Sequence, residues 1–504
     1  MFLITLTKPI QLSMMPAEVS MLLGIDLGTG SIKVLLQELD GTLRSSASVA
    51  YPVTSPEPGA AETHPALWMS ALAEAMAQLH QQVILQGPNT LPIDAIGFSG
   101  QMHGIVPLSQ SGEAIHPAIL WADSRGTEFL PLLDHYIKGR ETEIMNAPNA
   151  GMTAVSIVWF KKHRPELYEK TRWFLFPKDY IRYRLTGQIC TDFSDASGSL
   201  LYNFKTQSWD QDLCRLLQID ERKLPPIRKS LEVTGHTLGE ALRFGLPEQV
   251  PVVAGAGDTP AALFGSACFI EKAASQGIIQ ISVGTAVQVV RPLTTIPEYN
   301  QSLNYYESAL AGQGYQMAAM LNGGLALERV REWLHYDWEE FYQEFDKCPT
   351  DIPADLTFLP YLAGERTPYR NPDARGAWIG LSLQHTRRDL MASALFGVAC
   401  TVRLGIETLL GTKNAAYFTD FAFRLVGGSS CRSGWVTLLA SVLEHPLQVA
   451  EISDVSARGA AAMAGTMLSG ALPQQLKFHE IQPQQILGLE KRYNQFLQNY
   501  SALF

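Results

Sequence analysis

The sequence has 504 residues, of which 46% are hydrophobic and 17% charged, a mixture typical of a folded globular protein and not of a disordered chain. Because this length exceeds what one hydrophobic core usually supports, we expect two large domains. The formal net charge of −10 argues against nucleic acid or an anionic membrane as the main partner. A local glycine-rich loop in an acidic protein can still bind phosphate.

Cysteine usage and hydropathy restrict the environment of the protein. The six cysteines are scattered without a Cys-x-x-Cys pair, which argues against a disulfide framework or a zinc site and favours reduced thiols in the cytoplasm. We find no apolar run of the length of a membrane span. Residues 1–20 contain a short apolar run broken by Pro9, Gln11 and Pro16, so we expect a flexible tail rather than a signal peptide.

The predicted elements begin at residue 21 with three strands over 21–28, 32–39 and 42–53, linked by tight turns of which Asp-Gly at 40–41 is the clearest. Apolar residues then recur at helical spacing over 65–83, which predicts an amphipathic helix. A further strand is expected over 93–98.

This strand ends in Ser-Gly-Gln-Met-His-Gly, in which Gly100 and Gly104 bracket Met102 and His103. Two interpretations fit the local sequence. One is a tight turn with a core methionine and a satisfied histidine. The other is a loop whose backbone approaches a small polar ligand.

A second candidate loop lies in VPVVAGAGDTPAALFG, where a buried strand turns into a helix at Asp258. Asp258 either complements the dipole of the helix or has a functional role, and the local sequence does not decide between them.

The pattern strand, Gly-Thr, strand occurs twice in the chain. Residues 25–29 (IDLGT) align with residues 281–285 (ISVGT), and the later segment FAFRLVGGSSC again ends a strand in a glycine-rich loop. Because each copy opens about half of the chain, we expect a duplicated architecture with a ligand cleft between two lobes.

Taken together, nine segments resemble the FGGY family of carbohydrate kinases over residues 21 to about 465. They are GIDLGTGSIKV, GFSGQMHG, HPAILWADSR, FPKDYIRYRLTG, TDFSDASGS, VVAGAGDTPAA, SVGTAV, FLPYLAGERTP and LVGGSSCRSGW. The resemblance implies an α/β protein of two ribonuclease-H-like lobes, as in actin and Hsp70, with a central cleft. It places the N-terminal lobe at 21–270 and the C-terminal lobe at 271–504.

The resemblance also implies a reaction, the transfer of the γ-phosphoryl group of ATP to a sugar hydroxyl with Mg²⁺ as cofactor. GQMHG followed by Trp-x-Asp-x-Arg is typical of members that phosphorylate D-xylulose at O5. D-ribulose, L-ribulose or another polyol remain alternative acceptors. A catalytically weakened sugar-binding or regulatory protein and a polymerising actin-like ATPase are the alternatives of another class. Intact Asp26 and Asp258 argue against the former, and the sugar-kinase segments argue against the latter.

By the same resemblance, Asp258 is the catalytic base, and Asp26 and Asp258 are the metal-binding carboxylates. Met102, His103, Asp258 and Thr259 are expected to contact the sugar. Asp123 either contacts the sugar or only fastens its loop through an ion pair with Arg125. The expected nucleotide-binding residues are Gly28, Thr29, Ser31, Lys33, Gly284, Thr285, Gly427 and Gly428. Of these, Lys33 fits a solvated strand lysine equally well.

Three positions depart from the family pattern. Ser156 stands where many members have lysine, Phe396 where an acidic or amide residue is usual, and Ser429 where a third glycine is usual. The last bears on the affinity for adenosine, and all three leave room for a pentulose other than xylulose. A homodimer is compatible with the sequence, which does not set the oligomeric state.

Overall fold

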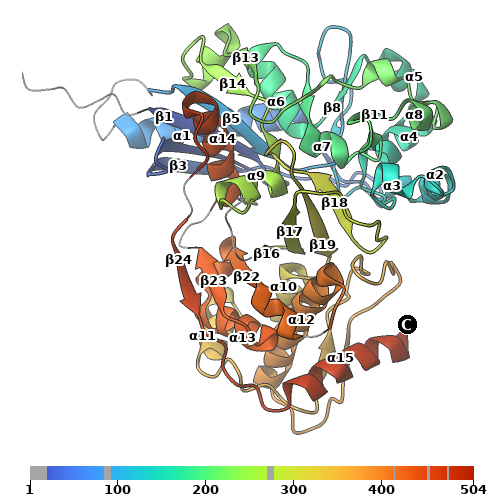
Figure 1. The fold of residues 1–504 in the computed structure, drawn as a ribbon, viewed down its shortest axis with the longest axis vertical. Coiled ribbons are helices and arrows are strands. Elements are labelled where there is room, and N and C mark those ends of the chain that lie inside the picture. Colours follow the sequence, from blue (N-terminus) through green and yellow to red (C-terminus); the bar gives the residue numbers. More distant parts are fainter. Residues whose placement is uncertain (1–19, 85–91, 270–276, 414, 451–453, 474–475) are drawn as a thin grey trace, which may run out of the picture.

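The computed structural model describes residues 20–84, 92–269, 277–413, 415–450, 454–473 and 476–504, and these form two lobes that each contain a mixed β-sheet with flanking helices (Figure 1). Residues 1–19, where a tail is expected, and the expected boundary at 270/271 lie outside the described residues.

The sheet of the first lobe has the strand order β3-β2-β1-β5-β14-β13. Its strands are β1 (Met21–Leu27), β2 (Ser31–Glu38), β3 (Leu43–Ala50), β5 (Ala95–Gly100), β13 (Val233–His236) and β14 (Pro251–Val253), with β15 (Ala256–Gly257) pairing the end of β5. The strands β1, β2 and β3 form antiparallel hairpins, and β5 joins β1 in parallel. The three predicted hairpin strands, the helix and the following strand are therefore confirmed.

The sheet of the second lobe repeats this order as β19-β17-β16-β22-β23-β24, with β18 added beyond β19. Its strands are β16 (Gly277–Val283), β17 (Val287–Leu293), β18 (Asn304–Glu307), β19 (Gly314–Met320), β22 (Phe421–Val426), β23 (Leu447–Ala450) and β24 (Phe478–Ile481). In both sheets the hairpin strand with the Gly-Thr turn pairs in parallel with a strand from later in the lobe. The predicted duplication and the α/β class are confirmed.

Helices and short strands complete the two lobes. The helices are α1 (Pro65–Ile84), α2 (Leu130–Ile137), α3 (Glu141–Ile144), α4 (Thr153–His163), α5 (Pro165–Lys170), α6 (Pro177–Thr186), α7 (Phe193–Ser197), α8 (Gln211–Leu216), α9 (Asp258–Gly265), α10 (Gly324–Trp333), α11 (Trp338–Asp346), α12 (Arg387–Leu410), α13 (Ser433–Leu443), α14 (Val455–Ser469) and α15 (Leu489–Leu503). The short strands are β4 (Glu62–Thr63), β6 (Val106–Leu108), β7 (Ala118–Ile119), β8 (Trp173–Leu175), β9 (Thr191–Asp192), β10 (Tyr202–Asn203), β11 (Ser208–Trp209), β12 (Ile227–Arg228), β20 (Thr357–Leu359) and β21 (Ala377–Ile379).

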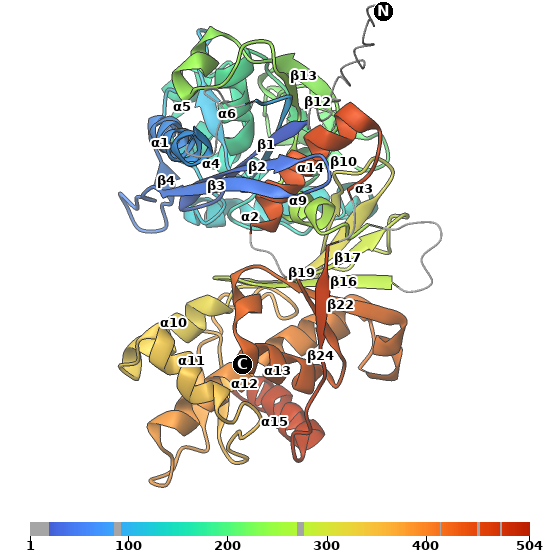
Figure 2. The same ribbon diagram turned by 90° about the vertical axis from the view of Figure 1, so that its left-hand side faces the viewer.

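Helix α14 lies between β23 and β24 of the second sheet in the chain but packs on the first sheet, against β1 and β5. Figure 2 shows it beside β1 in the first lobe. The contact is so close that a Cβ atom at Gly24 of β1 would lie 2.0 Å from the carbonyl oxygen of Ala457. A Cβ atom at Gly97 of β5 would lie 1.9 Å from that of Ala460. Glycine is thus required at both strand positions for the helix backbone to approach so closely. The chain thus returns to the first lobe at α14. The expected division at residue 270, which assigns all later residues to the second lobe, does not include this return.

Helix α12 is the central helix of the second lobe. By length and composition it could cross a membrane, although the sequence was expected to hold no such run, but 89% of its most apolar window is buried inside the protein. Its residues pack in the core formed with β16, β17 and β22. The apolar composition of α12 is therefore explained by its place in the core.

Candidate active site

Two carboxylates come together where neighbouring strands of the first sheet end. Asp26 on β1 pairs in register with Ser99 on β5, and Ser99 pairs with Ala256 on β15. Asp258 follows β15 directly and begins α9. Because these strands are parallel, their carboxyl ends lie at one edge of the sheet, which is where α/β proteins commonly bind ligands.

The two carboxylates influence each other. Burial raises the pKa of Asp258 to about 6, with a further contribution from the negative charge of Asp26. Burial also raises the pKa of Asp26, although a hydrogen bond of 2.8 Å from the Ser99 hydroxyl and the charge of Lys33 oppose this shift. A carboxylate with a pKa near 6 is ionised at neutral pH and is a stronger proton acceptor than an ordinary aspartate.

A cavity of about 470 Å³ opens beside Asp258, between the lobes. From the first lobe it is lined by Thr29, Met102, His103, Trp121, Asp258 and Thr259, and from the second lobe by Gln288, Asn304, Tyr306, Met317, Glu365 and Arg366 among others. The structure thus brings the expected residues Met102, His103, Asp258 and Thr259 together on one cavity. The hydroxyl of Thr259 also contacts Gln288 of β17 across the lobes, at 3.2 Å.

His103 lines this cavity, and one of its ring nitrogens is held by the backbone. Its Nδ1 donates a hydrogen bond of 2.9 Å to the carbonyl oxygen of Gly198, which leaves the lone pair on Nε2. Burial lowers the pKa of His103 to about 4, helped by the charge of Arg366 and opposed by the bond to Gly198. The imidazole is therefore neutral at physiological pH, and Nε2 can accept a hydrogen bond from a hydroxyl group.

The glycines that bracket this loop do not face the cavity. A Cβ atom at Gly100 would lie 2.9 Å from the Lys178 side chain, and one at Gly104 would lie 3.0 Å from Pro177. The two glycines let the loop pack closely against α6, while Met102 and His103 between them line the cavity. The space for Met102 comes instead from Gly257, where a Cβ atom would lie 2.5 Å from Cγ of Met102.

Two cavity residues were not singled out from the sequence, although both lie in the quoted family segments. The indole Nε1 of Trp121 donates a hydrogen bond of 2.8 Å to the hydroxyl of Thr29. The guanidinium of Arg366 donates one of 3.1 Å to the side-chain oxygen of Asn149, and burial lowers its pKa. Among the residues that the structure describes, no carboxylate lies within ion-pair distance of Arg366.

Asp123 lies away from the cavity and is held by other groups. It is 4% exposed, and its carboxylate lies 2.7 Å from the guanidinium of Arg125. It also accepts hydrogen bonds of 3.0 Å from the backbone N–H groups of Ala61 and Arg125. Of the two alternatives for Asp123, these contacts match the ion pair that fastens the loop.

Each of the two Gly-Thr hairpins turns tightly at the edge of its sheet. The Gly28 N–H donates to the carbonyl oxygen of Ser31 at 3.0 Å, and the Gly284 N–H donates to that of Ala286 at 2.9 Å. The nearest atom to a Cβ at Gly284 would be 4.0 Å away. The turn at Gly284 is thus open above the backbone, which suits the approach of a phosphate group.

The remaining expected nucleotide residues lie near these turns. Gly427 and Gly428 follow β22, which pairs with β16, and Gly427 has a φ of +90°. Ser31 begins β2, directly after the turn. Lys33 forms an ion pair of 2.6 Å with Asp454, so it is not simply a solvated strand lysine.

Two of the three departures from the family pattern are buried away from this site. Ser156 is 4% exposed in α4, and Phe396 is 5% exposed in the core helix α12. The side chain of Ser429 lies outside the described part of the chain.

Models of known families decide the classification. The model of the N-terminal domain of the FGGY family of carbohydrate kinases matches residues 21–265, and that of the C-terminal domain matches residues 281–468. The chain belongs to the FGGY family of carbohydrate kinases. It is therefore a phosphotransferase of the FGGY type, a class of kinases that use ATP.

Individual relatives agree with this family. The chain is 30% identical over 492 residues to a xylulose kinase of Escherichia coli, with 96% of each chain covered. It is 27% identical over 456 residues to a gluconokinase of Bacillus subtilis, covering 88% of this chain and 86% of the relative. A solved structure described as a xyloylose kinase from Brucella ovis has a TM-score of 0.84 at 29% identity and covers 96% of this chain and 98% of its own.

Proposed function

We propose that this FGGY kinase phosphorylates a ketopentose, D-xylulose first of all, at O5 with MgATP as donor. The observation that supports it most is Asp258, a carboxylate with a raised pKa on the wall of an inter-lobe cavity, beside the methionine and histidine of GQMHG. Relatives named xylulose kinase support the same acceptor. We place the reaction in the cytoplasm, because all six cysteines are free thiols.

In this proposal Asp258 receives the proton of the attacking hydroxyl. The O5–phosphorus bond forms while the bond between the γ-phosphorus and the β,γ-bridging oxygen breaks, and ADP leaves. The proton passes to the Asp258 carboxylate, whose pKa of about 6 leaves it ionised at neutral pH, while burial and the charge of Asp26 make it basic enough to accept the proton. The Thr259 N–H holds Oδ1 of this carboxylate at 2.7 Å, which leaves Oδ2 for the hydroxyl.

The carboxylates of Asp26 and Asp258 fit a divalent cation, because hard oxygen ligands at one edge of a sheet suit Mg²⁺. Bound there with ATP, Mg²⁺ would neutralise charge that develops on the phosphoryl oxygens. The Gly-Thr turns at Gly28 and Gly284, of which the second is open above the backbone, then offer backbone N–H groups to the phosphates from both lobes.

A sugar acid is the second candidate acceptor. Arg366 brings a positive charge to the cavity and, among the described residues, has an amide oxygen rather than a carboxylate as its partner. Such a guanidinium can donate to vicinal hydroxyls of a pentulose or to the carboxylate of an aldonate such as gluconate.

A coupled assay of ADP release across acceptors tests both candidates. D-xylulose, D-ribulose, L-ribulose, glycerol and gluconate are compared by kcat/KM at saturating MgATP, with ATP alone as the background. The highest value for D-xylulose supports the proposal. A far higher value for another acceptor reassigns the substrate and leaves the kinase intact.

A further inference from the structure

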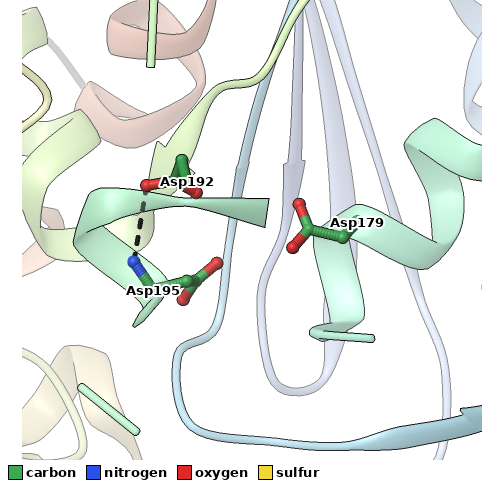
Figure 3. Close-up of side chains that lie close together, drawn as sticks. All are labelled: Asp179, Asp192 and Asp195. Carbon is green, nitrogen blue, oxygen red and sulfur yellow. Dashed lines mark hydrogen bonds between the residues drawn. The ribbon is translucent and has the colours of Figure 1, made fainter. Parts of the chain in front are cut away.

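A group of polar side chains lies directly behind Asp258, in the interior of the first lobe. This buried ionic cluster comprises Lys178, Asp179, Arg182, Asp192, Ser194 and Asp195, each with an exposed fraction of 0%. The first three belong to α6, and the others lie at the N-terminus of α7. Figure 3 shows the three aspartates of the cluster. They occupy the segments FPKDYIRYRLTG and TDFSDASGS, to which the proposed reaction assigns no part.

The cluster has the carboxylates of a metal site but holds its own cation. Oxygen atoms of Asp179, Asp192 and Asp195 lie within 4.8 Å of one another. The ammonium of Lys178 lies among them, 2.6 Å from Asp179, 2.5 Å from Asp192 and 3.0 Å from Asp195. Because this ammonium takes the place that a metal ion would take, the cluster is not a second metal site.

The cluster pairs cationic side chains with carboxyl groups. Burial alone would lower the pKa of Lys178, but the three aspartates raise it above its ordinary value. Burial raises the pKa of Asp195 well above its ordinary value, although Lys178 opposes the shift. The two cationic side chains of Lys178 and Arg182 thus lie among the three carboxyl groups, and this pairing makes the burial of the whole group tolerable.

The cluster holds the segment that leads to Asp258 at both of its ends. Arg182 donates a hydrogen bond of 2.5 Å to the carbonyl oxygen of Ala254. The hydroxyl oxygen of Ser194 accepts a hydrogen bond of 3.0 Å from the N–H of Gly257. Asp258 is the next residue, so the direction of its carboxylate depends on a peptide group that Ser194 fixes.

The direction of the Ser194 hydroxyl is itself determined by the cluster. Asp192 accepts hydrogen bonds from both the N–H of Ser194, at 2.8 Å, and its hydroxyl. Because the one hydroxyl proton points to Asp192, a lone pair of the oxygen is left for Gly257. Lys178 in turn holds Asp192 from its other oxygen.

We propose that the buried ionic cluster positions the general base, and that Ser194 is the positioning residue that acts through the Gly257 peptide group. This inference rests on the proposed role of Asp258. The cluster contributes to the rate by fixing the carboxylate where the acceptor hydroxyl attacks, since small displacements of a reacting group lower the rate strongly.

The test compares Ser194→Ala with Ser199→Ala as a matched control. Ser199 is also fully buried and lies in the same segment, but its hydroxyl donates to Ala196 and accepts from Leu201. We expect Ser194→Ala to lower kcat about 10-fold to 100-fold, with KM values for sugar and MgATP within about twofold of wild type, because the ligand contacts remain. Ser199→Ala is expected to keep the wild-type kcat. Equal kcat values for the two variants overturn the inference.

Further variants separate a positioning role from a loss of folding. Ser194→Thr keeps the hydroxyl and is expected to restore most of kcat, whereas kcat as low as that of Ser194→Ala counts against the inference. If Ser194→Ala does not fold, Ser194→Cys replaces it, because sulfur fills the site but accepts hydrogen bonds weakly. A wild-type kcat in Ser194→Cys also overturns the inference. Asp258→Asn is measured in parallel, and full activity there refutes the proposed base whatever the Ser194 variants show.

Discussion

Asp26 and Asp258 lie at the same edge of the first sheet, and the charge of Asp26 adds to the effect of burial in raising the pKa of Asp258 to about 6. The register across β1, β5 and β15 brings about this proximity, although 231 residues separate the two aspartates in the sequence. Several expected properties of the enzyme depend on this pair.

The first is the pH dependence of catalysis. A general base acts only when deprotonated, so protonation of Asp258 should remove activity in mild acid. The quantity to measure is kcat/KM for the sugar, at a MgATP concentration below the KM for MgATP. We expect it to be constant above pH 7 and to fall about tenfold per pH unit below about pH 6. Enzyme incubated at each acid pH and assayed again at pH 7.5 controls for denaturation. A profile that stays flat to pH 5 contradicts the assignment.

The second property is a conflict between activity and stability at Asp258. The variant Asp258→Asn keeps the shape but removes the proton acceptor, so kcat should fall by about 10²–10⁴ while both ligands still bind. The same change should raise the melting temperature at pH 7.5, because it removes a desolvated charge that costs about 1–3 kcal/mol. A variant with near-normal kcat shows that the base lies elsewhere.

The sign of this stability effect follows from linkage. The pKa of Asp258 is about 6 in the folded state, above the ordinary 3.8. At pH values between these two pKa values, the folded state therefore binds more protons than the unfolded state. Wild-type stability therefore falls as the pH rises through this window, whereas Asp258→Asn lacks this loss. Calorimetry should show a larger difference in melting temperature between the two proteins at pH 7.5 than at pH 5. A difference that does not change with pH contradicts the shift.

The sequence predicted the parts of the fold that are local in the chain. The hairpins after residue 21 and the helix over 65–83 follow from turn residues and hydrophobic spacing, and the repeated Gly-Thr motif revealed the duplication. The packing of α14 on the first sheet could not be predicted in this way. It depends on glycines in β1 and β5 that admit the backbone of a helix far away in the chain, and no local pattern records such a contact.

The candidate site shows the same division. Met102, His103 and Asp258 were predicted because each lies in a distinctive motif, and the structure places all three on one cavity. Arg366 was missed because nothing in its own segment says that the second lobe brings it to the same cavity. The packing of Gly100 and Gly104 against α6 could not be predicted, because a glycine that permits close packing looks the same in sequence as one that admits a ligand.

The open turn at Gly284 allows a test of the nucleotide site with little cost to folding. A Cβ atom there would have no neighbour closer than 4.0 Å, so Gly284→Val should fold normally. Its side chain would occupy the space that the phosphates need, and we expect the affinity for MgATP to fall at least about tenfold, one lost phosphate contact being enough for this change. Sugar affinity without nucleotide should be unchanged. Gly239→Val, at an exposed glycine of the first lobe, is the control, and equal nucleotide affinity in both variants contradicts the prediction.

Arg366 offers a test of acceptor recognition. The variant Arg366→Met keeps much of the side-chain volume and breaks one hydrogen bond to Asn149. Burial disfavours the charged form of Arg366. Removing this charge should therefore not lower the melting temperature. KM for the preferred acceptor should rise about tenfold or more, since the lost bonds come from a charged donor. Arg375→Met serves as the control, because Arg375 donates hydrogen bonds to the backbone oxygens of Pro372 and Ala374 and is not among the described residues that line the cavity. An unchanged KM in Arg366→Met shows that the acceptor does not reach the guanidinium.

Asp123 provides the opposite pattern, in which stability changes and substrate binding does not. Its carboxylate binds the guanidinium of Arg125 and the N–H of Ala61 in a buried setting. The variant Asp123→Asn should lower the free energy of unfolding by about 1–3 kcal/mol. The loss is moderated because Glu62 still lies 2.6 Å from Arg125.

If Asp123 only fastens its loop, KM for the sugar should stay within about twofold of wild type, because its carboxylate does not line the cavity. Asp212→Asn is the control, since Asp212 forms an ion pair with Arg215 in which both side chains are largely exposed, and such pairs contribute little. A rise in KM without a loss of stability in Asp123→Asn would show instead that the aspartate reaches the sugar. In that case the loop must move when the acceptor binds, because Arg125 would have to release a carboxylate that it now contacts at 2.7 Å.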